Sequence, residues 1–192
     1  MLNQENPAEL AFPLQLSNGQ NLLTTRAEAL AAAKDGLIEN VACPFNGVLF
    51  HRQLVDRIGF SLGEMFSWGD EAEYTYRARR AGFPPSTCVN AIHFHPLNRM
   101  KQRSFRFFMK TYNVTHVGNP MRDYQIVRNY AYITHTYFGC WKALKHTGRY
   151  TLFYLLEFGI GAAICACRAG IEGMCGIFVI HQKHQAKGPR PC

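Results

Sequence analysis

The chain has 192 residues, of which 47% are hydrophobic and 18% charged. This length gives room for one domain with a sizeable core, or for part of a larger one, and the composition excludes a disordered protein. The net charge of +8 is uneven: residues 1–96 hold 7 Lys or Arg against 10 acids, and residues 97–192 hold 14 against 3. A basic, aromatic-rich second half favours an anionic partner, either membrane headgroups or nucleic acid.

The cysteines and the N-terminus point to the compartment. Seven cysteines are present, an odd number, and no Cys-x-x-Cys pair occurs. This argues against a disulfide framework or a structural zinc module and favours a reducing compartment, with most cysteines buried as small apolar residues. The N-terminus shows no signal-peptide pattern. We therefore expect a cytoplasmic location.

The first quarter of the chain predicts short elements. Residues 1–23 hold prolines and an Asn-Gly pair and are expected to be irregular. A capping-box pattern at 25–28 predicts a helix that runs to Lys34. Residues 41–50 are apolar and predict a short strand leading into a buried segment. Residues 51–58 predict a short helix stopped by Gly59.

The middle of the chain alternates between helix and strand signals. Residues 70–81 predict a helix that ends at Gly82, and residues 87–95 alternate well enough for a strand. From Phe105 onward the spacing of aromatic residues favours helices, first over 105–112 and then over 124–134.

The stretch 151–167 is mostly apolar but contains Glu157 and is close to the shortest length that crosses a bilayer. An interfacial or core helix is favoured over a transmembrane span. A second apolar patch at 177–180 precedes a basic tail.

Acidic residues crowd the start of the helix expected at 70–81. Asp70, Glu71 and Glu73 follow the pair Trp68-Gly69. Helix N-termini stabilise carboxylates, so capping alone is one explanation; a proton acceptor with an aromatic wall for a sugar ring is the other. Glu71 points about 100° away from Asp70 around the helix, so the two neighbours can have different functions. Trp68 packed into the core is equally compatible with the sequence.

Two histidines end the strand expected at 87–95. His93 and His95 would share one strand face, because side chains alternate with period two. They could form part of a metal site, although two imidazoles do not complete one. Ordinary core or surface histidines are the alternative.

Several segments in this order resemble the second half of a family-two inverting glycosyltransferase with a GT-A fold, most closely its galactofuranosyl- and rhamnosyltransferase-like bacterial branch. The resemblance covers residues from about 40 to 140 and rests on residues 45–50, Arg52, 58–60, 66–74, Arg77, 81–83, His95-Pro96 and 127–130.

The resemblance implies roles for individual residues. Glu71, the second carboxylate of the acidic pair, would be the general base for the acceptor hydroxyl, with Asp70 before it. His95 would be a ligand of a divalent Mg²⁺ or Mn²⁺ ion. Trp68 and Glu73 are assigned to acceptor binding. A nucleotide-sugar donor and a glycan or lipid-linked acceptor are the implied partners.

One departure from the family concerns the donor site. No Asp-x-Asp motif occurs in the chain, and the first strands of the nucleotide-binding sheet are missing. We therefore expect a C-terminal part of a transferase, inactive when isolated. The expected fold class is α/β, a partial GT-A (Rossmann-like) core over 1–100 that lacks its nucleotide-binding half, followed by a helical basic region over 101–192.

Two classes of function follow from these observations. The first is glycosyl transfer with inversion in cell-surface polysaccharide or glycolipid synthesis, at the inner face of the plasma membrane. The second is a non-enzymatic, membrane-associated binding module derived from such an enzyme. Nucleic-acid binding is less favoured, because the charge comes with no recognised motif.

Overall fold

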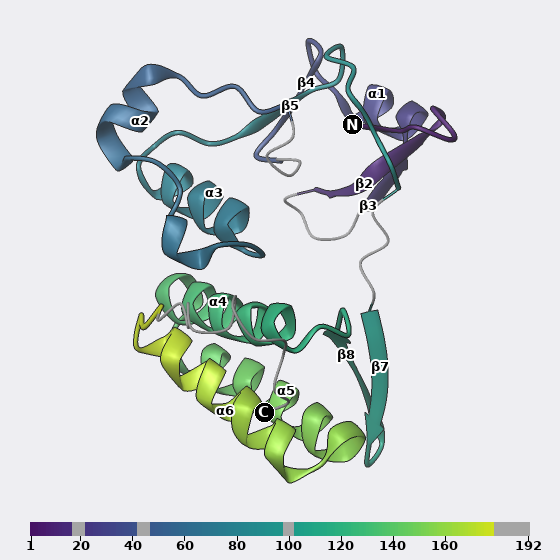
Figure 1. Cartoon of the computed structure of the whole chain (residues 1–192). Helices are drawn as coiled ribbons and strands as arrows, with labels where there is room; N and C mark the ends of the chain where they lie inside the picture. Colours follow the sequence, from purple (N-terminus) through teal and green to yellow (C-terminus); the bar gives the residue numbers. More distant parts are fainter. Residues whose placement is uncertain (17–21, 42–46, 98–101, 179–192) are drawn as a thin grey trace, which may run out of the picture. The chain divides into compact units, whose positions relative to one another are not determined.

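A computed structural model describes residues 1–16, 22–41, 47–97 and 102–178. The chain forms two compact units that are interleaved along the sequence (Figure 1). The first unit comprises Met1–Phe60 and Tyr74–Arg99, and the second comprises Ser61–Glu73 and Met100–Cys192. The fold is mixed α/β, with small sheets in the N-terminal part and three helices in the C-terminal part.

Within its described residues, the first unit contains two small sheets. Its four-stranded sheet has the order β3-β2-β1-β6, in which β1 and β6 are parallel and the other pairs antiparallel. A two-stranded sheet pairs β4 with β5. The strands are β1 (Leu2–Asn3), β2 (Glu9–Gln15), β3 (Leu22–Thr25), β4 (Leu37–Glu39), β5 (Ser86–Cys88) and β6 (Phe94–His95).

The strand predictions for this unit were largely wrong. Residues 1–16 form β1 and β2 although Pro13 suggested irregular structure; the register of β2 shifts between Glu9 and Leu14, which accommodates a residue without an N–H donor. The expected strand 87–95 is split between β5 and β6, which belong to different sheets. Consequently His93 lies outside any strand and shares no strand face with His95. Val41 and residues 47–50 form no strand, and 42–46 lie outside the described residues.

The predicted helices of the first hundred residues are confirmed. Helix α1 (Arg26–Ala32) begins with the predicted capping box, in which Thr25 and Glu28 exchange side-chain hydrogen bonds with each other's backbone N–H. Helix α2 (Arg52–Ile58) ends at Gly59. Helix α3 (Asp70–Arg80) begins with the acidic cluster.

The second unit begins its C-terminal part with a hairpin where the spacing had predicted a helix. Strands β7 (Gln102–Phe107) and β8 (Lys110–Thr115) pair in register, with Phe105 opposite Tyr112 and Phe107 opposite Lys110. Alternation with period two places Phe105 and Val114 on the buried face. The helical prediction for 105–112 was wrong, because apolar residues in two paired strands can mimic a helical spacing.

Three helices complete the second unit: α4 (Pro120–Phe138), α5 (Cys140–Phe158) and α6 (Ile160–Met174), which pack against one another (Figure 1). The helix predicted around 124–134 is confirmed as α4. Gly159 adopts a φ of +87° and ends α5, so the apolar stretch 151–167 is divided between two helices. Small residues allow close packing: a Cβ at Gly170 would overlap Thr147, and one at Gly173 would overlap the carbonyl of Arg128.

Within the described residues, no helix is both long enough and apolar enough to span a bilayer. The basic tail and the end of the patch at 177–180 lie outside the described residues. The division of the chain at residue 100 was inferred from family resemblance and charge, and it stays a prediction.

Candidate active site: an acidic loop held by helix α4

The loop over residues 65–69 leads into α3 and has an unusual backbone; it is called the acidic loop after the carboxylates that follow it. Phe66 and Trp68 both have a φ of +64°, and Gly69 has a φ of +104°. For a residue with a Cβ, the left-handed region costs about 1–2 kcal/mol. Such a conformation persists only where the surrounding contacts impose it, and it is commonest at functional sites.

Asn129 of α4 supplies the main contacts that hold this loop. Its side-chain Nδ2 donates to the carbonyl oxygens of Met65 (2.9 Å), Ser67 (2.8 Å) and Trp68 (2.9 Å). The residue is fully buried, with 0% exposure. Since one amide NH₂ has two protons, at least one of them is shared between two carbonyls. A single side chain therefore fixes the backbone on both sides of Phe66.

Two neighbours of Asn129 on α4 add to this attachment. The Nε of Arg128 donates to Asn129 Oδ1 at 3.0 Å, which orients the amide. The hydroxyl of Ser67 donates to Gln125 Oε1 at 3.2 Å. Burial lowers the pKa of the Arg128 guanidinium, whereas nearby Tyr124 and Glu172 raise it. These contacts make the acidic loop and α4 one structural element.

Gly69 is required where the loop passes α4. A Cβ at this position would lie 3.1 Å from Ile133 Cδ1 and 3.5 Å from Asn129 Cβ. The positive φ and the close approach together select glycine. The Gly in the Trp-Gly pair therefore brings the start of α3 against α4.

The two carboxylates assigned to proton transfer begin α3. The first helical hydrogen bond runs from the Glu73 N–H to the Gly69 carbonyl (2.8 Å), so Asp70 and Glu71 occupy the first turn. Both are half-buried. Carboxylates are favoured in a first turn, because its unpaired N–H groups and the helix dipole attract negative charge.

Glu73, assigned to acceptor binding, is 2% exposed. Its Oε1 accepts a hydrogen bond of 2.9 Å from the hydroxyl of Tyr137 on α4. In this position Glu73 joins α3 to α4, and contact with an acceptor stays a prediction.

Trp68 is half-buried and packs against the hydrophobic core of the second unit. The alternative that Trp68 packs into the core is thus partly confirmed. A role beside the acceptor stays a prediction for its remaining surface.

The histidine assigned to the metal belongs to the first unit. His95 lies in β6, where its Nδ1 is 2.7 Å from the carbonyl oxygen of Pro96 and its ring is 5.1 Å from that of Phe12. His93 is exposed, and its carbonyl accepts from the N–H of Leu2. Within the described ranges no three His, Cys, Asp or Glu side chains converge as metal ligands. These residues therefore do not form a complete metal site by themselves.

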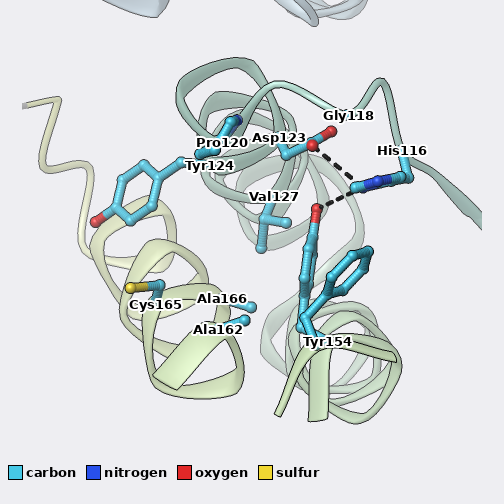
Figure 2. Close-up of a pocket in the computed structure, with 11 residues that line it drawn as sticks. His116, Gly118, Pro120, Asp123, Tyr124, Val127, Tyr154, Ala162, Cys165 and Ala166 are labelled. Atoms are coloured by element: carbon cyan, nitrogen blue, oxygen red, sulfur yellow. Dashed lines mark hydrogen bonds and ion pairs between the residues drawn. The ribbon is translucent and has the colours of Figure 1, made fainter. Parts of the chain in front are cut away.

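A second polar cluster lies in the second unit, at the end of a cavity of about 330 Å³ (Figure 2). His116 Nδ1 is 3.1 Å from Asp123 Oδ2 and 3.2 Å from the hydroxyl of Tyr154. Asp123 also accepts from the N–H of Val117 at 2.8 Å. Burial, and to a smaller extent the charge of Asp123, raises the pKa of Tyr154 above its ordinary value. The cluster connects the end of β8 with α4 and α5.

The sequence reasoning did not identify Gln125, Asn129 and Tyr137 as partners of the acidic loop. Gln125 and Asn129 are four residues apart and share one helix face. Polar side chains that recur at this spacing among Ile126, Val127 and Ala131 were a detectable signal for a buried polar contact.

Comparison with known proteins identifies related sequences over part of the chain. The chain is 36% identical over 95 residues to the galactofuranosyltransferase GlfT1 of Mycolicibacterium smegmatis. This match covers 49% of the chain and 32% of the relative. The chain is also 35% identical over 94 residues to GlfT1 of Mycobacterium tuberculosis, covering 49% and 30%. The matched part spans about a third of the length of these relatives. Across about half of its length, the chain is thus similar to a glycosyltransferase.

No protein-family model matches the chain. No solved structure matches it either.

Proposed function

We propose that this chain carries the acceptor-side part of a glycosyltransferase catalytic domain with a GT-A fold. It would act in cell-surface polysaccharide or glycolipid synthesis, at the inner face of the plasma membrane. The observation that supports this most strongly is the similarity to galactofuranosyltransferases over 49% of the chain. Since those relatives are named for galactofuranosyl transfer, a nucleotide-activated galactofuranose is the first donor to test.

The proposed reaction proceeds with inversion. Glu71 takes the proton of an acceptor hydroxyl while that oxygen attacks the anomeric carbon of the donor sugar. The bond between the anomeric carbon and the donor phosphate oxygen breaks, and its electron pair leaves with the nucleoside diphosphate. Asp70, in the same helical turn, is the next candidate for the base.

The loop geometry supports this assignment by positioning. A general base contributes only when it is held within hydrogen-bond reach of the proton that it removes. Asn129 and Gly69 fix the backbone that precedes Asp70 and Glu71. The strained conformation would thus keep the acidic turn in one place during turnover.

The metal ligand is a separate part of the proposal. His95 would provide one ligand of a Mg²⁺ or Mn²⁺ ion, whose charge would favour departure of the diphosphate. In a full-length protein that carries this segment, His95→Ala should raise the metal concentration needed for half-maximal activity more than His93→Ala does. Equal requirements in the two variants would remove His95 from this role.

The base assignment is tested in the same full-length protein. Glu71→Gln should lower turnover by about 10²-fold or more, because the amide cannot accept the proton, while donor binding is retained. Asp56→Asn, which changes an exposed carboxylate of α2, is the control and should leave turnover unchanged. Near-normal turnover of Glu71→Gln together with a loss in Asp70→Asn would transfer the role to Asp70.

Measuring donor binding by residues 1–192 tests whether these residues contain a complete donor site. Without an Asp-x-Asp motif, the isolated chain should bind uridine and thymidine diphosphate sugars weakly or not at all in calorimetry. Metal-dependent micromolar binding would reveal a donor site within these residues.

The alternative function is a non-enzymatic membrane-binding module. The missing Asp-x-Asp motif favours it. An Asp-x-Asp encoded upstream in the native reading frame would support the transferase, and a native transcript without one would support the module.

A further inference from the structure

A groove of about 670 Å³ lies between the β7–β8 hairpin and α5 in the second unit. The hairpin contributes Phe105, Phe107, Lys110 and Tyr112 to its lining, and α5 contributes Lys142, Lys145, His146, Gly148, Arg149 and Leu152. The register explains the hairpin's part: Phe107 pairs with Lys110, so both side chains lie on the face that Phe105 turns toward the core. The groove is thus formed mainly by two elements that pack together, and Thr134 of α4 completes its lining.

The groove is positively charged. Lys142, Lys145 and Arg149 follow one another at three- and four-residue spacing and therefore share one face of α5, and Lys110 approaches from the hairpin. Among the described residues that line it, none is acidic. The Nε of Arg149 is buried and has no hydrogen-bond partner within the described part of the chain.

His146 adds no positive charge at neutral pH. Burial, followed by the charge of Arg149, lowers the pKa of His146 to about 4. The positive charge of the groove thus comes from lysine and arginine and is constant over the physiological pH range.

Exposed apolar side chains flank these cations. Phe108 and Met109, in the turn between Phe107 and Lys110, are 85% and 88% exposed. Trp141, in the first turn of α5, is 68% exposed, and its ring lies 5.2 Å from the Lys145 ammonium. Lysine interleaved with aromatic side chains is the composition of interfacial membrane anchors, since the rings enter the headgroup layer and the cations face lipid phosphate.

We propose that this basic and aromatic face docks the second unit on a membrane that contains anionic phospholipids. The groove receives headgroup phosphates, and Phe108, Met109 and Trp141 enter the interface. Charge complementarity and the exposed rings favour a lipid surface over soluble phosphate, which would leave the apolar side chains in water. The inference rests on the proposed membrane location and not on glycosyl transfer, so vesicle binding and turnover can fail independently.

Co-sedimentation of residues 1–192 with vesicles tests the proposal. Binding is expected to vesicles of phosphatidylcholine mixed with phosphatidylserine, to be absent with phosphatidylcholine alone, and to weaken as salt rises. The double variant Lys142→Glu/Lys145→Glu should lower the partition coefficient at least about 30-fold, because each cation near such a surface contributes about 1 kcal/mol.

A matched control changes the total charge equally at another place. Lys34→Glu/Arg57→Glu alters two exposed cations of the first unit and should retain binding. Phe108→Ser/Met109→Ser should weaken binding without changing its salt dependence. Equal losses in both charge-reversal pairs would show that only net charge matters and would overturn the proposal. Binding to neutral vesicles, or displacement from vesicles by millimolar inorganic phosphate, would also overturn it.

Discussion

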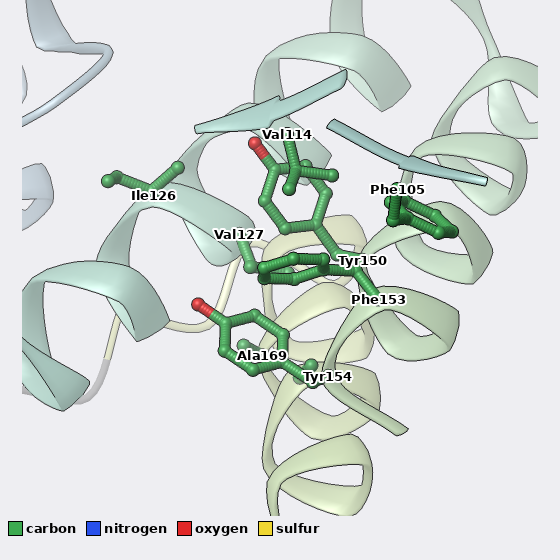
Figure 3. Close-up of a cluster of buried hydrophobic side chains, with 9 residues drawn as sticks. Phe105, Val114, Ile126, Val127, Tyr150, Phe153, Tyr154 and Ala169 are labelled. Atoms are coloured by element: carbon green, nitrogen blue, oxygen red, sulfur yellow. The ribbon is translucent and has the colours of Figure 1, made fainter. Parts of the chain in front are cut away.

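The two units bury their apolar residues in different ways. Among the described residues, the second unit has one contiguous core, in which aromatic rings of α5 meet the hairpin and α4 (Figure 3). The described part of the first unit has two smaller clusters, one among its strands and α1, and another where Leu54 meets α3. Both units expose large apolar side chains, with Leu49 99% exposed in the first and Met109 88% exposed in the second. The cost of deleting a buried side chain depends on how far its surroundings can collapse into the space that it leaves.

This difference can be probed by placing the same kind of substitution in each unit and measuring local stability by native-state hydrogen exchange. A substitution in the second unit should lower the free energy of unfolding more than its counterpart in the first unit, wherever the replaced side chain contacts several neighbours.

Deletion of a buried side chain should separate the units most. Phe153 is 1% exposed and contacts the rings of Phe105, His116 and Tyr154. Phe153→Ala should lower the free energy of unfolding of the second unit by about 3–5 kcal/mol. Leu14→Ala, in the strand cluster of the first unit, should cost about 2 kcal/mol. Equal losses would mean that the smaller cluster is as rigid as the larger one.

A buried asparagine occurs in each unit. Asn129→Ala removes a donor shared by three carbonyls, of which that of Met65 keeps another, the N–H of Ser67. The substitution should cost about 3 kcal/mol and should also lower turnover in a full-length protein. Asn3, 4% exposed, donates to Glu9 at 3.4 Å and accepts from Glu5 at 3.1 Å, so Asn3→Ala should cost about 1 kcal/mol. Exchange of the amides at 65–69 is the specific readout. If these amides exchanged as slowly in Asn129→Ala as in the wild type, Asn129 would not be what holds the acidic loop.

The second unit should lose stability in mild acid through His146. Its pKa of about 4 in the folded state lies below the ordinary value of 6.5, because burial disfavours the charged ring. The unfolded chain therefore binds a proton that the folded chain excludes, and the free energy of unfolding should fall by up to about 3 kcal/mol as the pH drops from 6.5 to 4. His146→Gln should flatten this dependence. His93→Gln, at an exposed site of the first unit, should not.

Glycines with positive φ provide the smallest contrast. Gly69 (φ +104°) faces Ile133, whereas Gly82 (φ +88°) of the first unit has open space around its Cβ position. Gly82→Ala should cost about 1 kcal/mol from backbone strain alone, and Gly69→Ala about 2 kcal/mol. Adding Ile133→Val should recover part of the loss in Gly69→Ala and none in Gly82→Ala. Without such recovery, the contact with Ile133 would not be the cause.

Local signals predicted the helices of the first hundred residues well. The capping box at Thr25 and Glu28 and the glycine at position 59 act within a few residues, so they can be recognised from the sequence. The hairpin was missed because Phe108 and Met109 are not typical turn residues, and because pairing of β7 with β8 depends on contacts with α5.

For the candidate site, the sequence predicted only the local structure correctly, and the roles of its residues stay predictions. The acidic residues at the start of α3 were placed correctly, since their neighbours in sequence define that helix. Asn129 lies about sixty residues from the loop that it holds, and no local pattern encodes that distance. The start of β6 at Phe94, which leaves His93 outside the strand, likewise depends on pairing with β1 at the far N-terminus.

The interleaving of the two units has a consequence for gene rearrangement. The chain leaves the second unit at Glu73 and returns to it at Met100. A single recombination crossover near residue 100 would supply the three helices without residues 61–73. Asn129 and Gln125 would then be inherited without the carbonyls and hydroxyl that they bind. The acidic loop and α4 would therefore have to be inherited together, which makes the segment from Ser61 onward the smallest transferable unit that preserves the candidate site.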